Sequence, residues 1–342
     1  MDSFRIVDGS NTAWLAFAQS QPEATTFHHP AWLGLLATTY RYRPLVLTQT
    51  DQRGIVAGLP MLEVRSWLTG HRFISLPFTD YCPPLSIDAD GLAQFAANLM
   101  KWWEGRGSPA VEVRARLPNL PHINLTSDAV RHVLPLDDDI RRLEHGLKPS
   151  WARAIRKARH EGIDIELTRS APAVSTFYRL HCMTRRRQGV PVQPKRYFEN
   201  LWTRIIEPGL GFVSLARMSG KPIAAAVFFS WNGNLIYKYG ASDPDHLRSR
   251  PNNLAIWAGV EWGCRNECRS VDFGRTLLEH EGLRNFKLGI GSIEMPLEYS
   301  FMGKGPLQAT RGAAMRTVSG VIKFSPPIVG RAIGELLYRH FP

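Results

Sequence analysis

The chain has 342 residues, 44% of them hydrophobic, with four cysteines and a net charge of +12. This length favours two domains, and the hydrophobic content lets each bury a core. No window reaches the ~18 uninterrupted apolar residues that a membrane-spanning helix needs. The start, MDSFR, lacks the basic and apolar segments of a signal peptide, and few, scattered cysteines are typical of a reduced compartment. We therefore expect a cytoplasmic protein.

The positive charge is confined to the second part of the chain. Residues 1–135 carry 11 basic and 11 acidic residues, whereas residues 136–342 carry 31 and 19. Such a surface suits phosphate-bearing partners, namely a nucleotide, a tRNA, a lipid-linked sugar or a membrane. The alternative is that the charge serves solubility alone.

The first third of the chain predicts two helices and then a mixed unit of strands and a helix. The helices are Thr12–Gln19 and Pro30–Tyr40. Alternating apolar residues and Gly-containing turns then predict strands at Leu45–Thr48, Ile55–Leu59, Phe73–Pro77 and Ala110–Val113, with a helix at Gly91–Glu104.

The same order of elements recurs about 160 residues later. The second copy predicts strands at Gly211–Ala216, Ile223–Ser230, Leu235–Tyr239 and Val271–Phe273, with a helix at Asn252–Arg265. A repeat of this length indicates two similar domains. We expect an N-terminal domain over 1–135, a C-terminal domain over 136–310 and a tail over 311–342, each domain being an α/β (α+β) mixed, mostly antiparallel sheet flanked by helices.

A basic helix, Trp151–His160, leads into the second copy. Pro149 cannot lie in a helix interior, so Ser150 is the expected N-cap and Gly162 the end. Trp151, Ile155 and Ala158 recur at helical spacing and face the core, whereas Arg153, Arg156 and Lys157 fall together on another, cationic face. From that face Arg156 and Lys157 are candidates for binding phosphate, and a merely solvated face is the alternative.

Two further stretches have ambiguous roles. The run Thr184–Gly189 holds three adjacent arginines and is expected on an exposed polar turn. The tail predicts a basic amphipathic helix at Ile328–Phe341, which either packs on the body or lies on an anionic membrane surface. Cys264 and Cys268 lie four apart on a predicted helix, but no second cysteine pair accompanies them. We expect them in the core and expect no metal site.

Several short motifs keep their order over residues 27–300. They are Ser75–Tyr81, the Trp151–Gly162 helix, Gly220–Ala225, Tyr239–Asp243, Asp272–Thr276 and Glu281–Lys287. Together they resemble the FemAB aminoacyltransferases, which have tandem GNAT-like domains, and especially their relatives associated with exopolysaccharide systems and PEP-CTERM sorting. The resemblance implies transfer of an acyl or aminoacyl group to an amine or hydroxyl of a cell-envelope precursor.

The loop before the second-copy helix is the expected donor site. GNAT enzymes bind pyrophosphate with a Gly-rich turn at a helix N-terminus. Here Arg248, Arg250 and Asn252 stand at that place, but the glycines are missing. Glycine permits close approach of the backbone, so its loss disfavours a conventional CoA donor. No cofactor is expected to be permanently bound, and the donor is either an acyl-CoA or an aminoacyl-tRNA.

The reaction needs a base and a group that stabilises developing negative charge. Glu281 is the first candidate base, although its position between two cations lowers its basicity. Transfer assisted by the substrate, without a protein base, is the alternative. Arg275 and Lys287 are candidates for binding phosphate or the oxyanion, and Asp272 completes the catalytic set. A structural Asp272–Arg275 pair and an exposed Lys287 are the alternatives.

Acceptor binding is assigned to residues at strand ends. Asp80 and Tyr81 precede a Pro-Pro lip in the first copy, and Tyr239 and Asp243 end a strand in the second. The leading hypothesis is thus a cytoplasmic, peripherally membrane-associated acyl- or aminoacyltransferase of envelope or exopolysaccharide assembly. The alternatives are a non-catalytic GNAT-like protein that binds a phosphate-containing lipid-linked sugar, and a tRNA-binding module, for which no dedicated motif is present.

Overall fold

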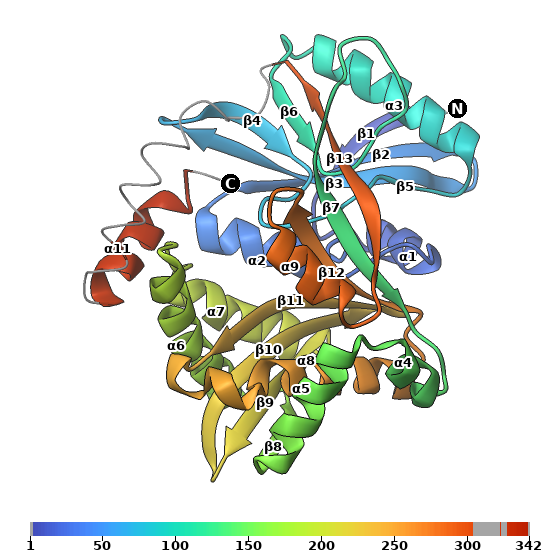
Figure 1. Ribbon diagram of the computed structural model, residues 1–342. Coiled ribbons are helices and arrows are strands. Elements are labelled where there is room, and N and C mark those ends of the chain that lie inside the picture. Colours follow the sequence, from blue (N-terminus) through green and yellow to red (C-terminus); the bar gives the residue numbers. More distant parts are fainter. Residues whose placement is uncertain (1–2, 304–321, 323–326, 341–342) are drawn as a thin grey trace. The chain divides into compact units, whose positions relative to one another are not determined.

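The computed structural model describes residues 3–303, 322 and 327–340 (Figure 1). Its contacts divide these residues into two compact units. Unit 1 comprises residues 3–129, 296–303 and 339–340, and unit 2 comprises residues 130–295, 322 and 327–338. The expected boundary at residue 135 lies a few residues beyond the one that the contacts define, because the chain passes from one unit to the other inside a strand.

Unit 1 is built on one mixed sheet with strand order β1-β2-β3-β4-β6-β13, and β5 pairs with β3. β2 and β3 form an antiparallel hairpin, whereas β4 and β6 are parallel and are joined through α3. Its elements are β1 (Ser3–Val7), α1 (Thr12–Ser20), α2 (Pro30–Tyr40), β2 (Arg43–Asp51), β3 (Gly54–Ser66), β4 (Gly70–Ile74), β5 (Leu85–Ser86), α3 (Ala89–Glu104), β6 (Ala110–Val113), the first part of β7 (Asn124–Pro135) and the end of β13 (Ile293–Met302).

Helices cover both faces of the unit 1 sheet. On one face α3 buries Phe95 and Leu99 against Leu47 and Leu59, in a core shared with β6. Strand residues alternate between faces, and Gly58 accordingly points the other way, toward α1. A Cβ at Gly58 would lie 2.8 Å from the Trp14 ring, so the close packing of α1 on β3 requires glycine there.

Unit 2 repeats this plan with strand order β7-β12-β11-β10-β9-β8. β9 and β10 form the antiparallel hairpin, and β11 and β12 are parallel strands joined through α8. Its remaining elements are α4 (Ile140–Gly146), α5 (Pro149–His160), β8 (Ile163–Thr168), α6 (Ala171–Gln188), α7 (Lys195–Leu201), the π-helix η1 (Trp202–Ile206), β9 (Gly211–Met218), β10 (Lys221–Trp231), β11 (Asn234–Ser242), the 3-10 helix η2 (Pro244–Ser249), α8 (Pro251–Arg265), β12 (Ser270–Leu277), α9 (Glu281–Leu288) and α11 (Pro327–Leu337).

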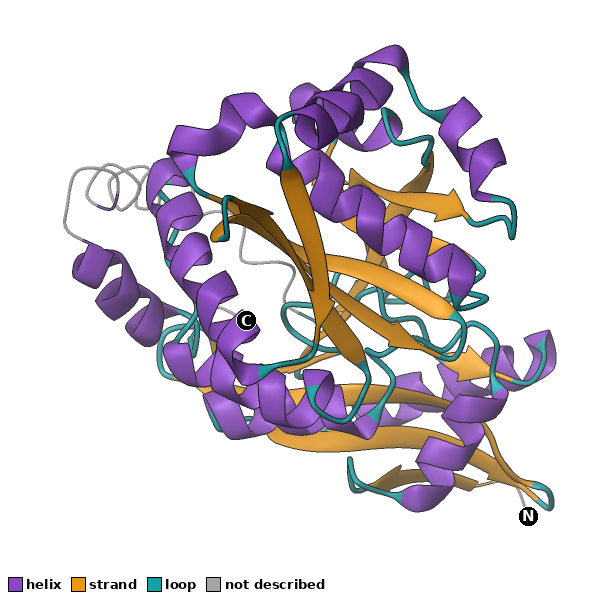
Figure 2. Ribbon diagram, turned by 90° about the horizontal axis from the view of Figure 1, so that it is seen from below, coloured by secondary structure: helices purple, strands orange, loops and turns teal. Residues whose placement is uncertain are grey.

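The unit 2 sheet is also covered by helices on both faces; Figure 2 distinguishes helices from strands by colour. The core on one side joins Trp151 of α5 and Trp257 of α8 to Phe228 of β10. On the other side Phe177 of α6 and Phe198 of α7 contact Tyr239 of β11. Both strands and helices therefore bury apolar faces, which fixes β10 and β11 in the middle of the unit.

The repeated unit predicted from the sequence is confirmed, as is the mixed α/β fold. Two local predictions were wrong. Lys148, not Ser150, is the N-cap of α5, because Pro149 occupies the first helical position. The arginines at 185–187 form the last turn of α6 and not a loop, and Gly189 ends that helix in the left-handed conformation with φ 70°. Cationic side chains in a last turn suit the negative end of the helix dipole.

The predicted tail helix packs within unit 2, and the two predicted core cysteines are buried there. α11 lies against the segment before α7: the Val192 amide donates to the Gly330 carbonyl (3.4 Å) and Tyr338 Oη to the Pro191 carbonyl (3.1 Å). Residue 341 of the predicted tail helix lies outside the described residues. Cys264 and Cys268 are buried in unit 2, as expected for core residues. Among the described helices, none is both long and apolar enough to cross a bilayer.

Candidate functional site

The parallel pairing between β11 and β12 is short. It joins Asn234–Ile236 to Ser270–Asp272, although β11 runs on to Ser242 and β12 to Leu277. The register of β11 against β10 also shifts at this point, where Lys238 is an additional residue between Tyr237 and Tyr239. A bulge of this kind bends a strand and redirects its side chains. Beyond these pairs the two strands continue without pairing to each other, and the chain leads from β11 through η2 into α8 and from β12 into α9.

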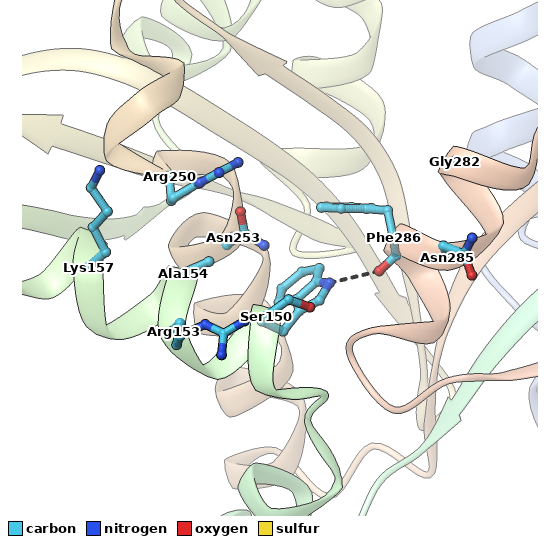
Figure 3. A pocket seen from close by; sticks show the side chains of 10 residues that line it. Ser150, Arg153, Ala154, Lys157, Arg250, Asn253, Gly282, Asn285 and Phe286 are labelled. Atoms are coloured by element: carbon cyan, nitrogen blue, oxygen red, sulfur yellow. Dashed lines mark hydrogen bonds between the residues drawn. The ribbon is translucent and has the colours of Figure 1, made fainter.

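A pocket of about 490 Å³ lies at the start of these helices (Figure 3). Its wall comes from three helices of unit 2, with cationic, polar and aromatic side chains. The lining residues are Ser150, Trp151, Arg153, Ala154, Lys157, Arg250, Asn253, Gly282, Asn285 and Phe286.

Helix α5 presents one continuous face to the pocket. Ser150, Arg153, Ala154 and Lys157 are spaced i, i+3, i+4 and i+7, so their side chains lie along one side of the helix. Lys157 Nζ lies 3.6 Å from Glu161 at the end of the same helix. This carboxylate therefore offsets part of the charge that α5 brings to the pocket.

The N-terminus of α8 forms a second wall. Arg250 precedes the helix with φ 61°, and Pro251 is its first residue. No side chain in the described part of the chain caps this end, and no acidic residue lies in the first turn. The positive end of the helix dipole and the Arg250 guanidinium thus favour an anion at the same place. Ser249 Oγ donates to Glu161 Oε2 (2.9 Å) and fixes this loop to α5.

An aromatic contact closes the pocket on the α9 side. The Trp151 and Phe286 ring centroids are 4.9 Å apart, and Trp151 Nε1 donates to the Phe286 carbonyl (2.8 Å). A Cβ at Gly289 would lie 2.6 Å from Trp151 Nε1, so α9 approaches α5 this closely because residue 289 is glycine. The pocket is consequently a cationic opening over an apolar floor.

Of the five residues predicted to bind the donor, two line the pocket and three do not. Lys157 and Arg250 line the pocket. Arg156 and Arg248 are exposed outside its lining, and Asn252 Nδ2 donates to Ser242 Oγ (3.2 Å) at the end of β11. The sequence placed Arg153 on the cationic face of α5 but did not assign it to the donor, although its i, i+4 spacing to Lys157 puts both side chains on one side of the helix. Asn253 and the contribution of α9 to the pocket were not predicted.

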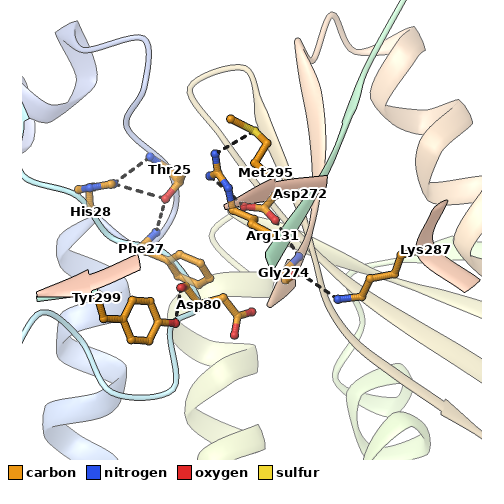
Figure 4. Close-up of polar contacts among 10 residues, drawn as sticks. All are labelled: Thr25, Phe27, His28, Asp80, Arg131, Asp272, Gly274, Lys287, Met295 and Tyr299. Carbon is orange, nitrogen blue, oxygen red and sulfur yellow. Dashed lines mark hydrogen bonds and ion pairs between the residues drawn. The ribbon is translucent and has the colours of Figure 1, made fainter. Parts of the chain in front are cut away.

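Asp272 and Lys287 both bind the backbone around Gly274 (Figure 4). Asp272 Oδ1 accepts a 2.7 Å hydrogen bond from the Gly274 amide. Lys287, which is buried and not exposed, donates to the carbonyls of Gly274 (3.0 Å) and Arg275 (3.2 Å). Gly274 has φ 70°, a conformation that glycine adopts without strain. Asp272 also forms an ion pair with Arg131 (3.3 Å), a partner that the sequence did not indicate.

Behind α9 lies a partly buried polar cluster that the sequence did not reveal. Arg284 binds Glu294 through Nε (2.9 Å) and Nη2 (2.8 Å), and His132 Nε2 lies 3.1 Å from the same carboxylate. Burial, together with the charge of Lys287, lowers the pKa of His132, so its imidazole is neutral at pH 7. The cluster fixes α9 to the second part of β7 and the start of β13 within unit 2.

The other two catalytic candidates lie at the start of α9 and on β12. Glu281 is the exposed first residue of α9, next to Gly282 of the pocket lining. Arg275 is half-buried on β12, directly after Gly274. Figure 3 shows the Phe286 side chain extending from α9 toward the start of α8, whereas Lys287 donates to the backbone of β12.

The acceptor candidates have well-defined local roles. In unit 2, Tyr239 Oη lies 2.7 Å from Tyr197 Oη, and Asp243 caps η2 and forms an ion pair with Lys221 (3.5 Å). In unit 1, the Asp80 carbonyl accepts from Tyr299 Oη (2.6 Å), and Tyr81 packs on the core.

The segment before Asp80 contains unusual backbone conformations. Leu76 and Phe78 have φ of 67° and 59°, although neither is glycine. Hydrogen bonds hold this segment from both sides: Trp32 Nε1 donates to Thr79 Oγ1 (2.9 Å) and Arg114 Nη1 to the Thr79 carbonyl (2.6 Å). Strain of this kind persists where surrounding contacts fix it, and it is frequent at binding sites.

Comparison with known proteins agrees with this arrangement. Residues 150–288, which include every residue of the pocket lining, match the family model described as an acetyltransferase (GNAT) domain. The match covers less than half of the chain, and this segment is thus similar to GNAT acetyltransferase domains. No curated protein matches the chain by sequence.

Solved structures extend the similarity to most of the chain. FemX is similar with a TM-score of 0.68 and 13% identity, covering 87% of this chain and 97% of FemX. The C-terminal domain of a putative lysylphosphatidylglycerol synthetase from Agrobacterium fabrum gives a TM-score of 0.54 at 11% identity, over 84% of this chain and 90% of that one. A tandem GNAT protein from the clavulanic acid biosynthesis pathway gives 0.51 at 12%, over 90% and 100%. The resemblance to FemAB-like GNAT proteins is thereby confirmed for the fold.

Proposed function

We propose that this protein is an acyl- or aminoacyltransferase that binds the anionic part of its donor in the α5–α8–α9 pocket. The observation that carries this proposal is the convergence of Arg153, Lys157 and Arg250 with the N-terminus of α8 on one pocket. Cations and a helix dipole together favour a phosphate group. Both candidate donor classes, acyl-CoA and aminoacyl-tRNA, carry phosphates, and both are found in the cytoplasm.

Within this proposal the catalytic residues have different tasks. Glu281 is the candidate base, since it begins α9 beside the pocket. Arg275 is the candidate group for stabilising negative charge in the transition state. Asp272 and Lys287 act as positioning residues, because their side chains hold the backbone of Gly274 and, for Lys287, the carbonyl of Arg275.

The acceptor is proposed to be an amine or hydroxyl of a cell-envelope or exopolysaccharide precursor. Support comes from similar structures whose names include FemX and lysylphosphatidylglycerol synthetase, the second of which refers to a lipid carrying an amino acid. Asp80, Tyr81 and Tyr239 are proposed to contact this acceptor. The strained segment at Leu76 and Phe78 supports the assignment in unit 1. Asp243 is proposed to shape the loop that carries Arg250, because it caps η2.

A thermal-shift experiment with a panel of donors tests the proposal. The panel contains acetyl-CoA, longer acyl-CoAs and the aminoacyl-adenosine end of a charged tRNA. A ligand at about 100 times its Kd stabilises the folded protein by roughly 2.7 kcal/mol. Each kcal/mol of stabilisation raises the Tm by about 2–4 °C in domains of this size, so the expected shift is several degrees. A shift with CoA esters alone identifies an acyltransferase, and a shift with the tRNA end alone identifies an aminoacyltransferase.

Two variants make the result specific to the pocket. Arg153→Ala removes a cation from the lining and is expected to abolish most of the shift. Lys195→Ala is the matched control, since Lys195 is an exposed helical cation paired with Glu199 outside this lining. Equal Tm shifts in both variants would show that the donor does not bind in this pocket. No shift with any donor, combined with binding of a sugar phosphate, would favour the non-catalytic binding protein.

A further inference from the structure

The turn between β3 and β4 exposes the most accessible large hydrophobic side chain of the described chain. Trp67 is 81% exposed, and its neighbour Leu68 is 45% exposed. We call residues Ser66–Gly70 the β3–β4 tip. Single exposed apolar residues are ordinary on protein surfaces. Two adjacent ones at the end of a hairpin are unusual, because a turn is normally formed by small polar residues.

The tip is held rigid by its own hydrogen bonds. Ser66 Oγ accepts from the amides of Leu68 (3.1 Å) and Thr69 (3.2 Å). Arg72 Nη2 donates to the Thr69 carbonyl (2.9 Å). Backbone groups that already have partners lose little when water is removed from them. The tip can therefore enter a less polar medium without breaking its turn.

Cationic side chains surround the two apolar residues. Glu63 is the acidic residue at this end of the hairpin, and its side chain is 5% exposed. Its carboxylate contacts Arg43 (3.3 Å), Arg65 (2.7 Å) and His71 (2.9 Å). Arg43 and Arg65 together carry two positive charges against the single negative charge of Glu63. Their side chains are 76% and 75% exposed. The surface around Trp67 is thus positively charged.

The last described residues of the chain add to this surface. Thr69 Oγ1 donates to the His340 carbonyl (2.9 Å), and the rings of Trp67 and His340 meet edge to face at 5.7 Å. Arg339 is exposed beside them and is held by a hydrogen bond from Tyr42 Oη to its carbonyl (3.0 Å). A hollow of about 390 Å³ next to Trp67 is lined by Arg65, Ser66, Trp67, Gly70 and His71.

We propose that the β3–β4 tip binds the surface of a bilayer that contains anionic phospholipid. Trp67 and Leu68 enter the headgroup region, and Arg43, Arg65 and Arg339 bind lipid phosphates around them. A tryptophan at the level of the headgroups with cations beside it is the arrangement that stabilises interfacial binding. Two apolar side chains are too few for a stable protein interface, which buries about 800 Å² on each partner.

This inference is independent of the proposed function. It rests on unit 1 and on the last described residues, and none of its residues lines the α5–α8–α9 pocket. A failure of the donor experiment would leave it standing. Conversely, a protein that binds no vesicle would still be free to bind a donor.

Sedimentation of the full chain with lipid vesicles tests the inference. The vesicles consist either of phosphatidylcholine alone or of phosphatidylcholine mixed with phosphatidylglycerol. We expect binding to the mixed vesicles and much weaker binding to the neutral ones, with a loss of binding as salt is raised. Trp67→Ala is expected to weaken binding to the mixed vesicles by about tenfold, since it removes the main apolar contact.

Ile87→Ala is the matched control, because Ile87 is another exposed apolar residue of unit 1, at 41%. It should bind mixed vesicles like the wild type. An unchanged Tm of Trp67→Ala shows that the effect is not unfolding. Equal binding by Trp67→Ala and the wild type overturns the proposal, as does a wild type that binds neither vesicle. If the wild type instead self-associates through Trp67 in size-exclusion experiments without binding vesicles, the tip is a protein contact and the lipid proposal is wrong.

Discussion

Trp151 occupies a central place among individual residues because it joins the core to the pocket. Its side chain is 3% exposed, packs beside Ile155 and reaches the backbone of α9 through Nε1. The contact depends on Gly289, whose missing Cβ leaves room for the indole. The absence of a Cβ at residue 289 thus allows the contact between Trp151 and Phe286 that lines the pocket.

Gly289→Ala tests this dependence. The added methyl displaces Trp151 and breaks the 2.8 Å hydrogen bond to the Phe286 carbonyl. We expect unfolding to become easier by about 1–3 kcal/mol, the usual consequence of overpacking. Urea denaturation measures the change. Gly146→Ala is the control, since no atom lies within 4 Å of a Cβ built there and alanine favours a helix. A Gly289→Ala variant as stable as Gly146→Ala would show that Trp151 has room to move.

The arginine at the start of α8 shows how an element combines structural and functional demands. Arg250 has φ 61°, where glycine is favoured over residues with a Cβ. Its side chain nevertheless lines the pocket with Asn253, while Pro251 supplies the fixed φ of a first helical residue. Residue 250 thus has the left-handed backbone conformation that glycine favours, but its side chain is an arginine. The resemblance to GNAT enzymes implies a Gly-rich turn at this position, and under the proposed function the Arg250 charge takes the place of close backbone approach.

Arg250→Gly separates the two demands. Relief of the left-handed conformation should leave the free energy of unfolding unchanged or raise it by up to about 1 kcal/mol. Loss of the guanidinium should weaken donor binding by about tenfold, the effect of removing one charged hydrogen bond. Melting curves with and without the donor measure both quantities. Ser219→Gly, at a turn residue with φ 50°, should gain stability without losing donor affinity. A donor shift retained in Arg250→Gly would contradict the role of this residue.

At the scale of the whole molecule, buried histidines make stability depend on pH. Burial lowers the pKa of His28 to about 4 and that of His181 to about 3, against an ordinary value of 6.5. The folded protein therefore keeps both rings neutral at pH values where the unfolded chain binds protons. Stability from this source is complete above pH 6.5 and falls as the pH is lowered toward the folded pKa values.

Urea unfolding at pH 7, 6 and 5 is expected to show this loss. Each histidine should reduce the free energy of unfolding by about 2 kcal/mol between pH 7 and 5. His181→Gln removes one proton-binding group and should flatten the dependence, and Gln retains a donor for Gln193 Oε1. His145→Gln, at an exposed position in α4, should leave the dependence unchanged. A wild-type stability that is constant between pH 7 and 5 would contradict the expectation.

Local patterns were sufficient to predict most of the repeated elements. The hairpin at Ser219–Gly220 follows from its turn residues, and α8 follows from Pro251 and the apolar run after it. β1, β5, β7, β8 and β13 were not predicted, because short or polar strands acquire their apolar contacts from partners distant in the chain. The helix at Glu281–Leu288 was also missed, since it spans only about two turns and its apolar contacts lie on α5.

The sequence by itself determined the duplicated plan, the cationic character of the second part, the place of Arg250 before a helix N-terminus and that of Lys157 on a cationic helix face. Only the tertiary structure decided that Arg153 shares their pocket, that Asp272 pairs with Arg131 and that Lys287 binds the backbone of β12. The physical reason is that helical and strand periodicity fix which side chains share a face. Periodicity does not specify which other element, often more than 100 residues away, packs against that face.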